Sequence, residues 1–197
     1  MSSSIKDAWQ QIVSWLESNA PSALEDVQGP ATAAEIDEAA KQMEAEFPPE
    51  LRAFFETVNG ADSCGIFPSN DDFDEMAYSP MALEQVIQDW ETQKELLEMG
   101  DFSDLEPKSD PGVADDWWNT GWIPFASNGG GDCFCVDLSP TDSGKLGQVI
   151  SHSHETGEHV VLAESLTEFL QQLVSRLEAN EMEYDEDYGL RKMESDE

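Results

Sequence analysis

The sequence predicts an α+β fold, in which helices pack around a mostly antiparallel sheet of about four to six strands. Segments with helical periodicity fill the first half of the chain and its end, whereas strand-like segments follow one another between residues 122 and 163. The chain shows neither an internal repeat nor the alternation of strands and helices that a parallel sheet requires. A doubly wound nucleotide-binding fold is therefore excluded.

Three helices are expected before residue 61. Apolar residues recur at helical spacing over residues 5–19 and predict the first helix. Thr32 and Glu35 have the spacing of a capping box, which predicts the start of the second. Pro48-Pro49 suits the first turn of a third helix, and Asn59-Gly60 is typical of its end.

A longer helix and a run of strands follow. After a short strand over residues 64–69, Ser79-Pro80 predicts a helix start and Gly100 its end. Ser165 and Glu168 predict a capped final helix, which should lie across the sheet. Between these two helices we expect a meander of strands at about residues 122–126, 132–138, 147–152 and 158–163.

Two ordered motifs carry a family resemblance. They are FPPELRAFFETVNG, residues 47–60, and WIPFASNGGGDCFCVDLSP, residues 122–140. Together with the strands and helix that follow, they closely resemble the SMI1/KNR4 (SUKH) superfamily over roughly residues 30–178. The resemblance implies a small α+β binding domain without catalysis. Such domains occur in bacteria chiefly as immunity proteins against polymorphic toxins, and in fungi within regulators of cell-wall assembly.

The chain departs from the family pattern in three places. We expect one domain over residues 1–178, with an extra N-terminal helix and an acidic insert near residues 100–120. Residues 179–197 form an acidic tail that should stay solvated and flexible, because it cannot bury enough apolar area to offset the entropy of ordering. Alternatively, the tail folds onto a basic groove of a partner and mimics the phosphates of a nucleic acid.

The charge of the chain limits its partners. Nine basic residues against 43 acidic residues leave a net charge of −34. Nucleic acids and anionic membranes are repelled by such a surface, whereas a basic protein is attracted. The alternative is that the charge serves only solubility or a salt-rich habitat.

Cysteine usage and hydropathy indicate a cytoplasmic protein. Cys64, Cys133 and Cys135 are odd in number and argue against a disulfide framework. The N-terminus lacks the basic start and apolar run of a signal peptide, and no stretch of about 18 apolar residues occurs.

The candidates for chemistry are weak. Gly129, Gly130 and Gly131 precede a strand rather than a helix, so they predict a turn and not a phosphate loop. Asp132 should bond loop amides rather than coordinate a metal. One alternative is a zinc site built from Cys133, Cys135, His152 and His154. Another is a metal-dependent hydrolase that uses the acidic clusters with the histidines. Our prediction is no catalytic site, no metal and no cofactor.

Acidic clusters interleaved with aromatic residues predict a partner-binding surface, because aromatic anchors and a charged rim are typical of interfaces. Trp117 and Trp118 have an alternative role as anchors that hold the insert to the fold. The predicted binding residues are Asp71, Asp72, Asp74, Glu75, Asp101, Asp104, Asp115, Asp116, Trp117, Trp118, Tyr184, Asp185 and Asp187.

These observations together predict a non-enzymatic immunity protein. It would neutralise a cognate toxin domain, basic in charge, by occluding the active site or substrate groove of the toxin. The alternative function is a scaffold or regulator of cell-wall assembly.

Overall fold

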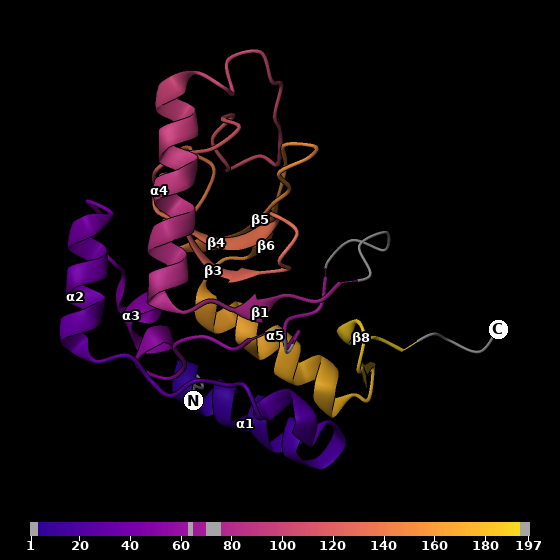
Figure 1. The fold of residues 1–197 in the computed structure, drawn as a ribbon. Coiled ribbons are helices and arrows are strands. Elements are labelled where there is room, and N and C mark those ends of the chain that lie inside the picture. Colours follow the sequence, from indigo (N-terminus) through magenta and orange to yellow (C-terminus); the bar gives the residue numbers. More distant parts are fainter. Residues whose placement is uncertain (1–3, 63–64, 70–75, 194–197) are drawn as a thin grey trace.

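The computed structural model describes residues 4–62, 65–69 and 76–193. It confirms the α+β class, because helices surround a mostly antiparallel sheet (Figure 1). The helices are α1 (Ile5–Asn19), a short 3-10 helix η1 (Pro21–Leu24), α2 (Ala33–Gln42), α3 (Pro49–Phe55), α4 (Leu83–Met99) and α5 (Leu166–Glu178). The strands are β1 (Ser79–Pro80), β2 (Lys108–Ser109), β3 (Trp122–Ser127), β4 (Cys133–Asp137), β5 (Gln148–His152), β6 (Glu158–Ala163), β7 (Met182–Asp185) and β8 (Gly189–Lys192).

The main sheet has six strands in the order β1-β3-β4-β5-β6-β2. Strands β3 to β6 form the expected antiparallel meander, and β1 adds to one edge in the antiparallel sense. Strand β2 comes from the insert and pairs in parallel with β6 at the other edge. Strands β7 and β8 form a separate hairpin near the C-terminus.

Several predicted helix ends are confirmed. The Thr32 hydroxyl accepts a hydrogen bond from the Glu35 amide at 3.3 Å, and the Glu35 carboxylate accepts one from the Thr32 amide at 2.7 Å. These two bonds satisfy amides that the first turn of α2 leaves without partners. Helix α4 ends at Gly100, whose φ of 80° lies in the left-handed region that glycine favours.

Two helix boundaries differ from the prediction. Ser79-Pro80 forms β1 and pairs with Ser127 and Ala126 instead of starting α4. Proline is tolerated at a sheet edge because it has no N–H to leave unpaired. Helix α4 begins at Leu83, whose amide donates to the Asn59 side chain at 2.9 Å. The third helix, α3, also ends earlier than expected, at Phe55.

One face of the sheet packs on α5 through aromatic rings. The Phe169 ring lies 5.8 Å from that of Phe125, 5.6 Å from that of Phe134 and 5.5 Å from that of Phe67. These distances are within the range of favourable aromatic contacts. As predicted, α5 crosses the sheet. Helix α1 packs against α5 on the side that faces away from the sheet (Figure 1).

The opposite face of the sheet is buried as well. All five residues of β4 are buried, including Asp137. Its carboxylate accepts hydrogen bonds from the Ser139 amide at 2.9 Å and from the Gln148 side chain at 2.9 Å. Burial raises the pKa of Asp137, and these two bonds lower it in part.

The predicted C-terminal tail contains the β7–β8 hairpin. The Leu190 amide donates to the Gly65 carbonyl at 2.8 Å, and the Ala77 amide donates to the Tyr188 carbonyl at 2.9 Å. Met182 and Leu190 are buried. These contacts order residues 182–192, where the sequence analysis expected a flexible segment, because apolar residues spaced among the acids have a surface on which to pack.

Candidate partner-binding surface

Trp118 holds the acidic insert to the face of the sheet opposite α5. This side chain is buried, and its ring lies edge-on at 5.9 Å from Trp122 and at 5.0 Å from His152. Trp118 therefore has the anchoring role that the sequence analysis considered as an alternative.

Trp117 lies partly exposed on the turn between β5 and β6. It stacks on Phe102 with ring centroids 6.5 Å apart. A Cβ atom at Gly157 would overlap the Trp117 ring, so a glycine is required beneath it. The two neighbouring tryptophans thus differ, because only Trp117 retains accessible surface.

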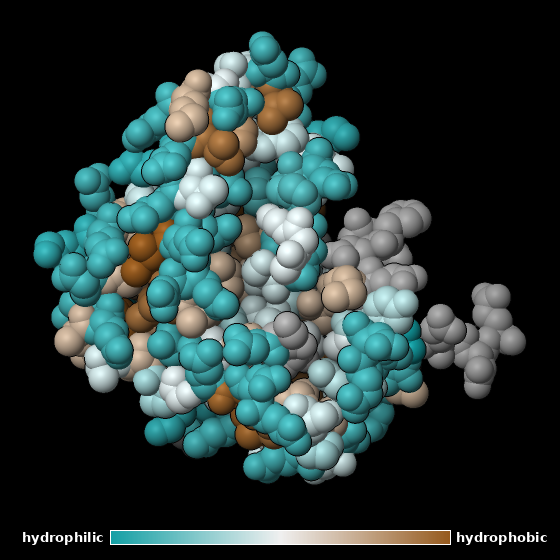
Figure 2. Space-filling view, in the orientation of Figure 1, coloured by the Kyte–Doolittle hydropathy of each residue, from teal (hydrophilic) through white to brown (hydrophobic). Residues whose placement is uncertain are grey.

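Exposed apolar side chains gather where α4 meets the insert. Leu97, Met99 and Leu105 are 39%, 72% and 42% exposed. Brown atoms at the top of Figure 2 mark this region against a mainly hydrophilic face. We call it the apical surface, and it consists of Leu97, Met99, Phe102, Leu105 and Trp117 together with the exposed carboxylates of Asp101, Asp104, Asp115 and Asp116.

A second feature is a groove of about 450 Å³ between α4, the turn after β3 and the β7–β8 hairpin. Helix α4 and the hairpin lie on either side of β1 (Figure 1). We call this feature the acidic groove. The residues of its lining that matter here are Asp62, Gln88, Asp89, Tyr184, Glu186, Asp187 and Tyr188.

The predicted binding residues therefore fall into separate groups. Those of the insert lie at the apical surface, except for the buried Trp118. Tyr184 and Asp187 line the acidic groove. Asp185 instead supports the hairpin turn, because its carboxylate accepts from the amides of Asp187 and Tyr188 at 2.8 Å and 3.2 Å. The predicted residues outside the described part of the chain are Asp71, Asp72, Asp74 and Glu75.

Sequence reasoning missed Asp62, Asp89 and Glu186 as members of one groove. Asp89 lies within the periodic α4 segment, so its position read as an ordinary polar face of a helix. It is partly buried, and burial raises the pKa of its carboxyl group. No linear pattern brings residues 62, 89 and 186 together. Only the pairing of β1 with β3 and the docking of the hairpin do so.

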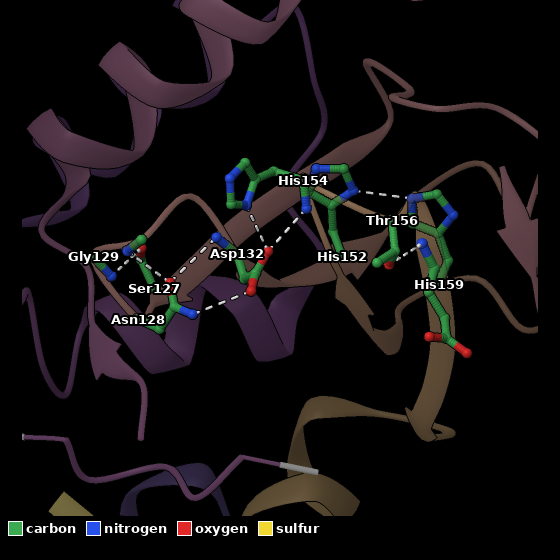
Figure 3. Close-up of polar contacts among 10 residues, drawn as sticks. Ser127, Asn128, Gly129, Asp132, His152, His154, Thr156 and His159 are labelled. Carbon is green, nitrogen blue, oxygen red and sulfur yellow. Dashed lines mark hydrogen bonds and ion pairs between the residues drawn. The ribbon is translucent and has the colours of Figure 1, made fainter. Parts of the chain in front are cut away.

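The glycine-rich turn is organised by polar side chains (Figure 3). The Asp132 carboxylate accepts from the His154 amide at 2.8 Å and lies 2.8 Å from His154 Nδ1. Its other oxygen accepts from the Asn128 side chain at 3.2 Å. Asn128 in turn accepts from the Gly130 amide at 2.8 Å. As predicted, Asp132 bonds a loop amide, which is that of His154 in the turn between β5 and β6.

Two histidines are buried between the sheet and the insert. His152 Nδ1 lies 2.9 Å from His159 Nε2 (Figure 3), and His159 Nδ1 lies 3.1 Å from the Ser109 hydroxyl. Burial lowers the pKa of His152 to about 3 and that of His159 to about 4, so both rings are neutral at pH 7.

The four residues of the alternative zinc site, Cys133, Cys135, His152 and His154, do not converge on one point. The sulfur atoms of Cys133 and Cys135 lie 3.4 Å apart, but His152 bonds His159 and His154 bonds Asp132. Within the described residues, no three side chains of the types His, Cys, Asp or Glu are arranged to hold a metal ion. In the same part of the chain, every helix is too short or too polar to span a bilayer.

The helices around the mostly antiparallel sheet define an α+β domain. A sequence model described as "SMI1 / KNR4 family (SUKH-1)" matches residues 30–172. The chain belongs to this family, as its two motifs indicated.

Similar proteins come from fungi. The chain is 23% identical to a "Glucan synthesis regulatory protein" of Neurospora crassa, over 96% of its own length and 41% of that relative. It is 24% identical to "Cell wall biosynthesis/cell cycle regulator smi1" of Schizosaccharomyces pombe, over 93% of its length and 38% of that relative. It is also 24% identical to "Cell wall assembly regulator SMI1" of Saccharomyces cerevisiae, over 87% and 40%. The chain thus spans about two-fifths of each relative.

These similarities overturn the predicted function. The prediction of a bacterial immunity protein with a toxin as its partner is wrong, because the similar proteins are fungal and are named as regulators of glucan synthesis or of the cell wall. The error arose because the shared motifs encode the fold, and a fold alone does not distinguish two uses of one domain.

Proposed function

We propose that this chain is a regulatory binding module that acts in the control of cell-wall assembly. The observation that carries the proposal is the similarity to three cell-wall or glucan regulators along nearly the whole chain. The module works by holding other proteins of this process together or apart, and its own surface carries out no reaction.

The absence of catalysis in this proposal is supported by how the polar groups are used. Asp132 and His154 bond each other and the glycine-rich turn. The buried histidines bond each other and Ser109, and both are neutral. These groups stabilise loops and the sheet, whereas a general base needs a free position beside a substrate.

Binding takes place, in this proposal, at the apical surface and the acidic groove. The apical surface has the composition of an interface, with exposed apolar side chains and a rim of carboxylates. The free thiols of Cys133 and Cys135 support a reducing compartment such as the cytoplasm.

Deletion of the gene in its host tests the proposal. We expect altered wall glucan content and altered growth on compounds that attack the wall, both restored by the parent gene. A variant with Leu105→Glu and Met99→Glu, which charges two exposed positions of the apical surface, should restore less than a variant with Glu91→Gln and Glu95→Gln on α4. Unchanged wall composition and growth after deletion would contradict the proposed function.

A further inference from the structure

The acidic groove is built from segments that lie far apart in the sequence. One wall is α4, the other is the β7–β8 hairpin, and β1 with the preceding residues forms the floor. The hairpin is fixed in place by the bonds of Leu190 to Gly65 and of Ala77 to Tyr188. The groove is therefore a feature of the folded chain and does not depend on a single loop.

The charge of this groove has one sign. Four carboxylates line it, from Asp62, Asp89, Glu186 and Asp187, and no Lys or Arg occurs among its described lining residues. The Glu186 carboxylate accepts a hydrogen bond from the Ser22 hydroxyl at 3.1 Å. No side-chain hydrogen bond or ion pair is formed by Asp62, Asp89 or Asp187 within the described part of the chain. A concave wall of unbalanced carboxylates concentrates cations at its surface.

Asp89 adds a more specific requirement. Its carboxylate is partly buried against the sheet, and this burial disfavours the charged form. A cationic side chain placed beside Asp89 would offset that cost, because an opposite charge within a few ångströms stabilises a carboxylate. An incoming cation would therefore stabilise the charged form of Asp89.

Two tyrosines frame the outer wall of the groove. Tyr184 and Tyr188 both belong to its lining, and Tyr188 is 37% exposed at the hairpin turn, where the Arg191 guanidinium already lies 6.0 Å from the centre of its ring. Aromatic rings attract guanidinium and ammonium groups through their faces and also cover the alkyl parts of Lys and Arg. Carboxylates together with tyrosines therefore suit long basic side chains better than small ions.

We propose that the acidic groove binds an extended protein segment that carries at least two Lys or Arg side chains. The inference rests on the proposed function, for which it names the chemistry of the partner. A volume of about 450 Å³ suits a few side chains but not a folded domain, since pockets for small ligands measure roughly 300–1,000 Å³. Asp89 receives one cation, and Asp187 with Tyr184 receives the next, since Arg191 already lies over the ring of Tyr188.

Peptide binding to the full chain tests the groove directly. The probe is a fluorescent peptide, Gly-Arg-Ala-Lys-Ala-Arg-Gly, measured by anisotropy at about 0.15 M salt, where weak surface attraction is largely screened. The combined variant Asp89→Asn and Asp187→Asn should raise Kd about tenfold or more. The control variant Glu91→Gln and Glu95→Gln removes the same charge from exposed positions of α4 and should raise Kd less than about threefold. Thermal unfolding of both variants establishes that they are folded.

Three outcomes would overturn the inference. Equal weakening by the two variants would show diffuse attraction to a negative surface. Unchanged binding in the groove variant would place the peptide elsewhere. Tight binding of spermine together with no peptide binding would assign the groove to a small polyamine. None of these outcomes touches the regulatory function itself, which the gene deletion tests independently.

Discussion

At the scale of single residues, the buried histidine pair has one consistent arrangement of protons. The Ser109 hydroxyl donates to the Ala114 carbonyl at 3.1 Å, so its oxygen accepts from His159 Nδ1. His159 Nε2 then carries no proton and accepts from His152 Nδ1. This chain of bonds joins β5 and β6 to the insert, and it requires the His159 ring to be neutral.

The pair makes stability depend on pH. In the unfolded chain each histidine binds a proton near pH 6.5, whereas the folded pKa values are about 3 and about 4. The contribution of each neutral ring is therefore present above pH 6.5 and is lost as the pH falls toward those values.

Substitution of His159→Gln should remove one of these titrations. When the pH is lowered from about 7.5 to about 5, the free energy of unfolding should fall by about 2 kcal/mol more in the parent than in the variant. Urea unfolding at each pH measures it, and comparison with the variant cancels the titration of the many carboxylates. A difference that does not change with pH would contradict the neutral pair.

A single glycine determines whether Trp117 can cover the β5–β6 turn. Gly157 and Gly129 both have positive φ, 63° and 75°, but only a Cβ at Gly157 would overlap the Trp117 ring. Substitution of Gly129→Ala should cost about 1 kcal/mol of stability from backbone strain alone. Gly157→Ala should cost about 1–3 kcal/mol more. Equal losses of unfolding free energy would show that Trp117 does not pack on this turn.

At the scale of elements, the sequence predicted best those features that depend on local chemistry. The capping box of Thr32, the end of α4 at Gly100 and the strands of the meander follow from periodicity and turn residues. The start of α4 was missed because Ser79-Pro80 pairs with β3, residues distant in sequence. The hairpin was missed because Leu190 is stabilised by contacts with Gly65 and not by its acidic neighbours.

The candidate site was predictable only in part, for the same reason. Aromatic residues among acids in the insert drew attention to Trp117, which keeps accessible surface. The same pattern could not separate it from Trp118, since burial depends on which side of the chain faces Trp122 and His152. Asp89 gave no signal at all, because its partial burial arises only in the folded chain, where α4 packs on β3.

The insert should detach locally when its anchor is removed. Trp118→Ala removes a buried ring and should destabilise the protein by about 3–5 kcal/mol. Residues 100–120 should then exchange their amide hydrogens much faster than β4 and β5. Trp117→Ala serves as the control, because this partly exposed ring should cost less and leave exchange of the insert slow. Uniform acceleration over the whole sheet in Trp118→Ala would contradict a separately anchored insert.

At the scale of the whole molecule, the net charge of −34 exceeds what ion pairs can balance. Every ion pair among the described residues has at least one exposed side chain, and in pairs such as Lys41 with Glu38 both are exposed, so each contributes little. Repulsion among the remaining carboxylates therefore opposes folding.

Added salt should stabilise the protein through screening. Raising NaCl from about 0.02 M to about 0.5 M shortens the Debye length from about 20 Å to about 4 Å and should raise Tm by several degrees. KCl at equal ionic strength should raise Tm by the same amount if screening is the cause, whereas binding of a particular ion would make the two salts differ. A fall in Tm would mean that ion pairs, and not repulsion, dominate the electrostatics of the fold.

The central claim is that this member of the SMI1/KNR4 family regulates by binding a basic protein segment in the acidic groove. Photo-crosslinking in the living host tests it most directly, with a photoreactive amino acid at Gln88 in the groove and, as a control, at Gln10 on α1. The account predicts crosslinks from position 88 to Lys- or Arg-containing segments of proteins that build or control the cell wall, and none of these from position 10. Crosslinks to the same partners from both positions, or none from position 88, would contradict it.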